Sequence, residues 1–277
     1  MRIRLAHSPD PDDAFMFYGL ACGAVAPGPY QFEHVLEDIQ SLNERALRGE
    51  YEVTAISIHA YPHVADKYAL TSCGSSMGDN YGPRVVARER LAVEELRGRR
   101  IAIPGRMTTA FLTLQLLLGK DTFTPTVVMF DQIPAEVVAG RFDAGLIIHE
   151  GQLTYPQLGL HLIVDLGVWW QERTGLPLPL GGNVIRRDLG AARCREIAGI
   201  LKQSIQYGLD HREEAVRYAL QYGRGLDERL ADEFVGMYVN KWTLDYGERG
   251  RAAVQRLLRE GAAAGLVPDA GEIGFVS

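Results

Sequence analysis

Short apolar runs alternate with helical patterns through the first half of the chain. Residues 2–7, 30–36 and 52–58 have the pattern of strands, whereas residues 12–21 and 39–47 have apolar positions at helical spacing. The order strand, helix, strand, helix, strand is typical of parallel βαβ units in an open α/β sheet. Ligands of such sheets bind beyond the carboxyl ends of the strands.

The alternation then starts again. We predict helices over 110–118 and 133–139, a loop over 174–182, and strands over 83–88, 99–103, 126–130, 142–149, 162–166 and 183–186. The rest of the chain forms a helical C-terminal tail, with helices predicted over 191–209, 212–222, 227–241 and 248–261.

This organisation predicts an α/β protein with two lobes and a ligand cleft between them. We expect the chain to cross to the second lobe near residues 84–88 and to return near 182–186. The first lobe then comprises residues 1–85 and 184–277, and the second comprises residues 86–183. Two crossing strands would form a hinge.

Composition narrows the function classes. The 277 residues include 29 Lys and Arg against 35 Asp and Glu, a formal charge of −6, without a basic run that would favour nucleic acid. The three cysteines are far apart and form no metal-ligand pattern. No apolar leader and no stretch of eighteen apolar residues occurs, so we expect a cytoplasmic protein without a membrane partner. The oligomeric state stays open.

Two loops after predicted strands carry candidate binding residues. Residues 8–13 form either a simple capping turn or a polar lip of the cleft. The next loop follows Ala55 and Ile56, and its Ser57 offers a hydroxyl and backbone N–H groups to an anion. A base role for His59 is possible, but a lone histidine in an apolar setting is more often a core residue. The sequence leaves open whether His7 or His59 reaches the cleft.

A third loop has the features of an anion site. Gly105 makes a turn after a strand, and Thr108 and Thr109 begin a helix, whose first N–H groups and dipole favour negative charge. Arg106 adds a cation in the same loop. The alternative is helix capping by threonine alone.

A fourth loop delivers His149 to the carboxyl end of a strand, where a general base is useful. Glu150 is adjacent, but consecutive strand residues point to opposite faces. A structural histidine is the alternative. Trp169 and Trp170 supply flat apolar surface, either for the core or for the wall of a pocket that takes an aromatic ring.

Several of these segments occur together in one family. The chain resembles the 1,4-dihydroxy-6-naphthoate synthase family of the futalosine route to menaquinone, through segments that cover nearly its whole length: Ser8-Pro9-x-Pro11-x-Asp13-x-Phe15, Val35-Leu36-Glu37-Asp38, Pro104-Gly105-Arg106-x-Thr108-Thr109-Ala110, Ala144-Gly145-Leu146-Ile147-Ile148-His149-Glu150, Asp165-Leu166-Gly167-x-Trp169-Trp170, Tyr238-Val239-Asn240 and Leu244-Asp245-x-Gly247-Glu248.

The resemblance implies a type 2 periplasmic-binding-protein fold and a cytoplasmic carbon–carbon lyase that needs no cofactor or metal. Its substrate is a small anionic aromatic molecule, cyclic dehypoxanthine futalosine, which is cleaved to 1,4-dihydroxy-6-naphthoate. The resemblance assigns the base to His149 and substrate contacts to Thr108, Thr109 and Ser57. Two alternatives are a non-catalytic anion-binding protein of the same fold and the chorismate dehydratase of the same pathway.

The chain also departs from the family pattern. Members commonly read Ser-Pro-Cys-Pro-Asn-Asp-Thr-Phe where this chain has Asp10, Asp12 and Ala14, and many carry a lysine at the position of Ala55. These changes make the lip of the cleft more acidic, so Arg106 or backbone donors would have to hold an anionic substrate.

Overall fold

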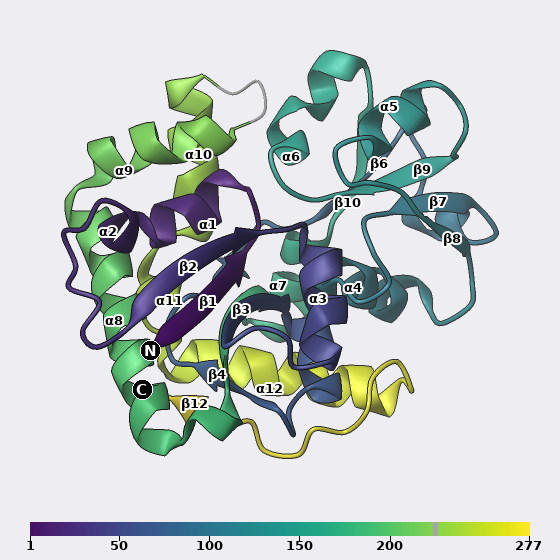
Figure 1. The fold of residues 1–277 in the computed structure, drawn as a ribbon. Coiled ribbons are helices and arrows are strands. Elements are labelled where there is room, and N and C mark those ends of the chain that lie inside the picture. Colours follow the sequence, from purple (N-terminus) through teal and green to yellow (C-terminus); the bar gives the residue numbers. More distant parts are fainter. Residues whose placement is uncertain (224–226) are drawn as a thin grey trace.

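The computed structural model, described here for residues 1–223 and 227–277, has two mixed β-sheets that are flanked by helices (Figure 1). The first sheet has the strand order β12-β4-β11-β3-β1-β2, and β5 pairs with β11 beside this path. Its strands are β1 (Arg2–His7), β2 (Gln31–Leu36), β3 (Val53–Ser57), β4 (Tyr68–Thr71), β5 (Ser76–Gly78), β11 (Leu178–Arg186) and β12 (Phe275–Val276). The second sheet has the order β10-β6-β9-β7-β8. Its strands are β6 (Arg84–Ala87), β7 (Arg100–Ile103), β8 (Thr124–Val127), β9 (Ala144–Ile147) and β10 (His161–Asp165).

The predicted βαβ units are confirmed. Strand β1 pairs in parallel with β2 and β3, and β7 pairs in parallel with β8 and β9. The long β11 runs antiparallel to β3 and β4, and β6 runs antiparallel to β9 and β10. The carboxyl ends of the parallel strands of both sheets therefore supply loops to the space between the lobes.

Helices cover both sheets, and most of the C-terminal third is helical (Figure 1). The α-helices are α1 (Pro11–Met16), α2 (Tyr18–Ala21), α3 (Ile39–Leu47), α4 (Thr109–Leu118), α5 (Ile133–Val138), α6 (Gly151–Thr154), α7 (Leu166–Thr174), α8 (Ala191–Asp210), α9 (Arg212–Ala219), α10 (Glu228–Tyr238), α11 (Lys241–Leu244) and α12 (Gly247–Ala263). Short 3₁₀ helices are η1 (Ile58–His63), η2 (Val93–Leu96), η3 (Tyr155–Leu158), η4 (Arg187–Leu189) and η5 (Leu220–Tyr222). No helix in the described ranges is long and apolar enough to cross a bilayer.

Two differences from the predicted elements have physical causes. The predicted helix over 12–21 is interrupted at Phe17, whose buried ring packs against His7 and separates α1 from α2. The loop predicted over 174–182 is wrong, because α7 extends to Thr174 and β11 already begins at Leu178. The Gly and Pro residues of this segment are typical of a loop, but β11 pairs with β5 there, with a register shift between Pro179 and Gly181. The sequence pattern also missed α7 and the short strands β4, β5 and β12.

The two predicted lobes correspond to the two sheets with the helices that pack on them. The boundaries at 85/86 and 183/184 stay a prediction.

Two segments that connect the sheets touch each other. Leu166 N donates to Pro83 O at 2.9 Å, and a Cβ at Gly167 would overlap the carbonyl oxygen of Tyr81. Only a residue without a side chain fits at this crossing.

We expect Gly167→Ala to lower the free energy of unfolding by about 1–3 kcal/mol, because backbone must move to admit the methyl group. A matched control is Gly199→Ala in α8, where a new Cβ would meet nothing beyond its own helix within 4 Å. Alanine should raise helix stability there by up to about 1 kcal/mol. Urea unfolding of both variants tests this, and equal midpoints for the two would contradict the close approach.

A second prediction concerns acid stability. Burial lowers the pKa of His7 and His59 to about 4. Between pH 6.5 and 4 the unfolded histidines therefore bind protons that the folded ones do not, and the free energy of unfolding should fall as the pH falls through this window. The Asp13 carboxyl, whose pKa burial raises to about 6, acts in the opposite direction.

The variant His7→Gln isolates the contribution of a buried histidine. His7 Nε2 lies 3.0 Å from His34 Nδ1, so glutamine retains a polar partner without titrating in this range. Urea unfolding at several pH values should give a shallower loss of stability for the variant than for the wild type. Parallel curves would show that His7 does not contribute.

Candidate functional site

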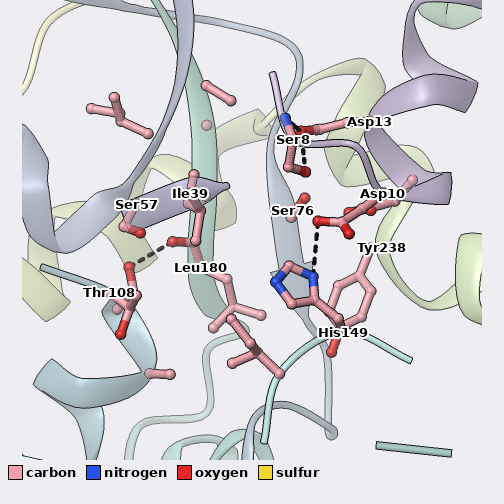
Figure 2. A pocket seen from close by; sticks show the side chains of 18 of the residues that line it. Ser8, Asp10, Asp13, Ile39, Ser57, Ser76, Thr108, His149, Leu180 and Tyr238 are labelled. Atoms are coloured by element: carbon pink, nitrogen blue, oxygen red, sulfur yellow. Dashed lines mark hydrogen bonds and ion pairs between the residues drawn. The ribbon is translucent and has the colours of Figure 1, made fainter. Parts of the chain in front are cut away.

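A cleft lies where loops from both lobes meet β11, and its space, including the part open to solvent, is about 740 Å³. Figure 2 shows Ser57 and Thr108 on one side of it and Asp10, His149 and Tyr238 on the other, with Ile39 and Leu180 between. The lining combines apolar side chains with a few polar groups, as is usual for small-molecule sites.

His149 is held by a carboxylate from the other lobe. Its Nδ1 lies 3.0 Å from Asp10 Oδ2, whose side chain is 1% exposed. The buried Nε2 has no hydrogen-bond partner among the described residues. Phe130 packs on the imidazole with ring centroids 4.4 Å apart. The ring therefore has one nitrogen fixed by an anion and the other available in the cleft.

The backbone around His149 differs from the predicted strand. Strand β9 ends at Ile147, and His149 lies two residues beyond it with a φ of 60°. Its carbonyl accepts a hydrogen bond from Gln152 N at 3.1 Å, which closes a turn into α6. A left-handed conformation is uncommon for a residue with a side chain and occurs often at functional sites. Here it turns the imidazole toward Asp10.

Asp10 belongs to a buried group of carboxylates before and within α1. Asp13 accepts hydrogen bonds from Ser8 N and Ser8 Oγ, both at 2.7 Å. Burial, together with the neighbouring Asp13 and Asp10, raises the pKa of Asp12, whose Oδ1 has no partner among the described residues. This wall of the cleft is acidic, and its carboxyl oxygens accept hydrogen bonds.

Thr108 and Thr109 lie at the start of α4, as predicted, but their hydroxyls are already bonded within the protein. Thr108 caps the helix by accepting from Phe111 N at 3.3 Å. Thr109 Oγ1 donates to Leu180 O at 2.6 Å and accepts from His59 N at 3.1 Å. The donors that such a helix start leaves for an anion are the first-turn N–H groups, since these have no carbonyl four residues earlier.

Ser57 ends β3 and lines the same side of the cleft, together with Ala55 and Ile56. The amide of the buried Asn43 holds it from behind: Asn43 Nδ2 donates to Ser57 Oγ at 3.0 Å, and Ser57 N donates to Asn43 Oδ1 at 2.8 Å. The Ser57 hydroxyl is thus oriented and keeps its own proton for a ligand.

Four other candidates lie outside the cleft. Arg106 is exposed and donates to Pro125 O at 3.3 Å, and it is not among the lining residues. His59 is buried behind the threonines, with Nδ1 2.9 Å from Thr108 O. Trp170 is a fully buried core residue, and Trp169 stacks on Arg173. Apolar walls come instead from Ile39, Ile148, Leu180 and Phe234.

Sequence reasoning missed two contacts that complete the site. It did not identify Asp10 as the partner of His149, and it did not predict the hydrogen bond of 2.8 Å from Tyr238 Oη to Gln152 Oε1, which joins α10 to α6. The cluster of carboxylates in residues 8–13 was visible, but only the fold brings it to the imidazole. The part of the chain that is described contains no group of three or more His, Cys, Asp or Glu that is suited to a metal ion.

Solved structures match the fold over nearly the whole chain. A crystal structure of protein AF1704 from Archaeoglobus fulgidus has a TM-score of 0.91 and 47% identity, and covers 96% of this chain and 98% of that one. The alkanesulfonate-binding protein SsuA from Xanthomonas axonopodis pv. citri has a TM-score of 0.74 and 14% identity, and covers 98% and 96% of the two chains. The predicted two-lobed periplasmic-binding-protein fold is confirmed.

Sequence comparison identifies relatives of the same length. A protein named 1,4-dihydroxy-6-naphtoate synthase from Thermus thermophilus is 45% identical, over 95% of both chains. One of the same name from Streptomyces coelicolor is 39% identical, over 97% of this chain and 96% of that one. The family model described as menaquinone biosynthesis matches residues 3–263. The chain therefore belongs to the menaquinone biosynthesis family.

Proposed function

We propose that this protein is a 1,4-dihydroxy-6-naphthoate synthase, a cytoplasmic carbon–carbon lyase that cleaves cyclic dehypoxanthine futalosine without a cofactor. The observation that carries the proposal is the buried His149 imidazole, with Nδ1 on Asp10 and Nε2 unpartnered in the cleft among the described residues. The 45% identity to the Thermus protein of that name supports the choice of substrate.

The cleft orients an anionic aromatic substrate. The substrate carboxylate binds the first-turn N–H groups of α4, where the helix dipole adds a favourable field. Its flat ring lies among Ile39, Ile148 and Leu180, which are apolar residues of the cleft lining. Ser57 donates from the same side as the helix start, so the acidic wall near Asp10 faces the ribose-derived part.

His149 Nε2 acts as the general base. It removes a hydroxyl proton from the ribose-derived part, the C–O bond there becomes a carbonyl, and the carbon–carbon bond to the fused ring breaks. In this retro-aldol-like step the released electron pair moves onto a ketone oxygen of that ring, which takes up a proton as the ring becomes a naphthalene, and the ribose-derived part leaves with the new carbonyl. Asp10 is a positioning residue that keeps the proton on Nδ1 and stabilises the imidazolium as it forms.

A general base supplies only about 10²–10⁴-fold of rate, so positioning and water exclusion must supply much of the rest. We propose that the two lobes, residues 1–85 with 184–277 and residues 86–183, close over the substrate. The side-chain contacts that join them include those from Asp10 to His149 and from Tyr238 to Gln152, both at the cleft. Closure thereby aligns the base at the moment when water leaves.

The activity is tested by incubation of the purified protein with cyclic dehypoxanthine futalosine and, separately, with chorismate. Ultraviolet absorbance of the naphthoate product should appear only with the first. Dehydration of chorismate would favour the alternative enzyme of the pathway. Tight binding of the naphthoate without turnover would favour a non-catalytic binding protein.

His149→Asn should lower turnover about 10²–10⁴-fold, because asparagine keeps hydrogen-bonding groups but accepts no proton near neutral pH. Affinity for the product should stay within a few fold. The control is His211→Asn, an exposed histidine at the end of α8, which should leave turnover unchanged. Turnover and product affinity are measured on the same preparations.

A structural role for His149 predicts a lower melting temperature, with turnover reduced only in step with the folded fraction. More than about a tenth of the wild-type rate in a folded variant would place the base elsewhere. Asp10→Asn should lower kcat while KM and product affinity stay within a few fold, because the imidazole loses its orienting anion and not its contact with substrate.

Two substitutions at Thr109 separate the contribution of its N–H group to carboxylate binding from the contribution of its hydroxyl. Thr109→Val removes only the hydroxyl, which is already bonded to Leu180 O. Thr109→Pro also removes the N–H, at a first helical position that accepts proline. Since a donor to a charged group contributes about 1.5–3 kcal/mol, proline should weaken product binding about ten- to a hundredfold relative to valine. Equal affinities in calorimetry, with both variants folded, would remove the anion site from this helix start.

A further inference from the structure

Asn183 is a buried polar residue of the cleft that the mechanism above does not use. It is 1% exposed and lines the cleft, and neither its Nδ2 nor its Oδ1 has a hydrogen-bond partner among the described residues. A buried amide without partners is unfavourable in a folded protein unless something outside the chain satisfies it. Such a group on the wall of a cleft points to a ligand.

Packing, and not hydrogen bonding, fixes this amide. The main chain of Asn183 is bonded in the sheet, opposite Ala55 of β3, and its carbonyl accepts from Thr71 Oγ1 at 3.0 Å. The side chain lies against Gly74, where a Cβ would overlap Nδ2. The amide is therefore held in place with its donors and acceptor unused.

We call the start of α4 at Thr109, where the substrate carboxylate is proposed to bind, the anion end of the cleft. Asn183 lies at some distance from it. The hydroxyl of Thr109 is bonded to Leu180 O, and Asn183 follows Leu180 by three residues along β11. At the rise of a strand this separation is about 10 Å, the length of a fused ring system. Asp12, on the side of the cleft that carries Asp10, lines the same cleft as Asn183.

The acidic wall on that side limits the ligand chemistry. Asp10 contacts His149 and Asp13 accepts from Ser8, whereas Oδ1 of the cleft-lining Asp12 is unpartnered among the described residues. The Asp10 carboxylate and the acidic side chains beside it disfavour a substrate carboxylate on this wall. An amide and a carboxyl oxygen together offer two N–H donors and two acceptors, which suits neighbouring hydroxyl groups.

We propose that Asn183 and Asp12, which both line the cleft, bind the hydroxyl groups of the substrate's ribose-derived part, with Asn183 about 10 Å along β11 from the anion end at Thr109. This inference rests on the proposed function and adds the orientation of the substrate to it. Acceptors for hydroxyls at one end and donors for a carboxylate at the other allow one orientation, which brings a ribose hydroxyl to the side of the cleft that carries His149.

The test compares substrate and product in the variant Asn183→Leu, which keeps the size of the side chain and removes its polar atoms. The product retains the carboxylate and the naphthalene but lacks the ribose-derived part. We expect kcat/KM for cyclic dehypoxanthine futalosine to fall about ten- to a hundredfold, while the dissociation constant of the product changes less than about threefold. The melting temperature of the ligand-free variant should be unchanged or higher, since no internal hydrogen bond is lost.

Asn43→Leu is the stability control, because the Asn43 amide does bond within the protein and its loss should lower the melting temperature. A fall in melting temperature for Asn183→Leu, with activity lost in step, would assign Asn183 a structural role and overturn the subsite. Equal loss for substrate and product, or an unchanged kcat/KM, would also overturn it. Absence of turnover in the wild type would instead overturn the proposed function and the subsite with it, so the two failures are distinguished.

Discussion

The ion pair between Asp10 Oδ2 and His149 Nδ1 is the contact on which the arrangement of the site depends. Asp10 precedes α1 in one lobe, and His149 follows β9 in the other. A buried carboxylate is costly without a partner, and so is an imidazole nitrogen that loses water. The pair satisfies His149 Nδ1 with a buried carboxylate, and it forms only when the lobes are close enough for the two side chains to meet. In the proposed mechanism this makes alignment of the base a property of the closed protein and not of one lobe.

Strand β11 runs along the cleft, and several of its residues contact or line the site. Its Leu180 carbonyl receives the Thr109 hydroxyl, which ties the start of α4 to the first sheet. Gly182 lies where a side chain would overlap the buried Tyr246 hydroxyl, so the strand can pass close to α12. Asn183 then presents to the cleft an amide that no described residue bonds. One rigid strand thus sets the distance between the two ends at which a substrate is proposed to bind.

The sequence predicted the fold more completely than the site, and the reason is physical. Periodicity and the βαβ order are local signals, and they gave β1, α3 and α8 nearly residue by residue. The segment 166–182 was misassigned, although Asp165 caps α7 through Gly167 N at 2.9 Å and Gly175 ends it with a φ of 70°. Those cap signals were readable, whereas the pairing of β11 with β5 depends on residues about a hundred positions away. The same holds for Asp10 and His149, which no local pattern joins.

The acidic lip has a different meaning in the structure than in the sequence. Read as a pattern, Asp10 and Asp12 in a protein of net charge −6 oppose an anionic substrate. In the fold, Asp10 is bonded to His149, Asp13 accepts from Ser8, and the helix start with the opposite polarity lies across the cleft (Figure 2). Repulsion at one end and attraction at the other add to the same preference for one orientation of the substrate. The Asp10 carboxylate, which would weaken binding of an anion at the lip, also stabilises the positive charge that His149 gains on accepting a proton. In the proposed mechanism the same group therefore disfavours an anion in the ground state and stabilises the transition state.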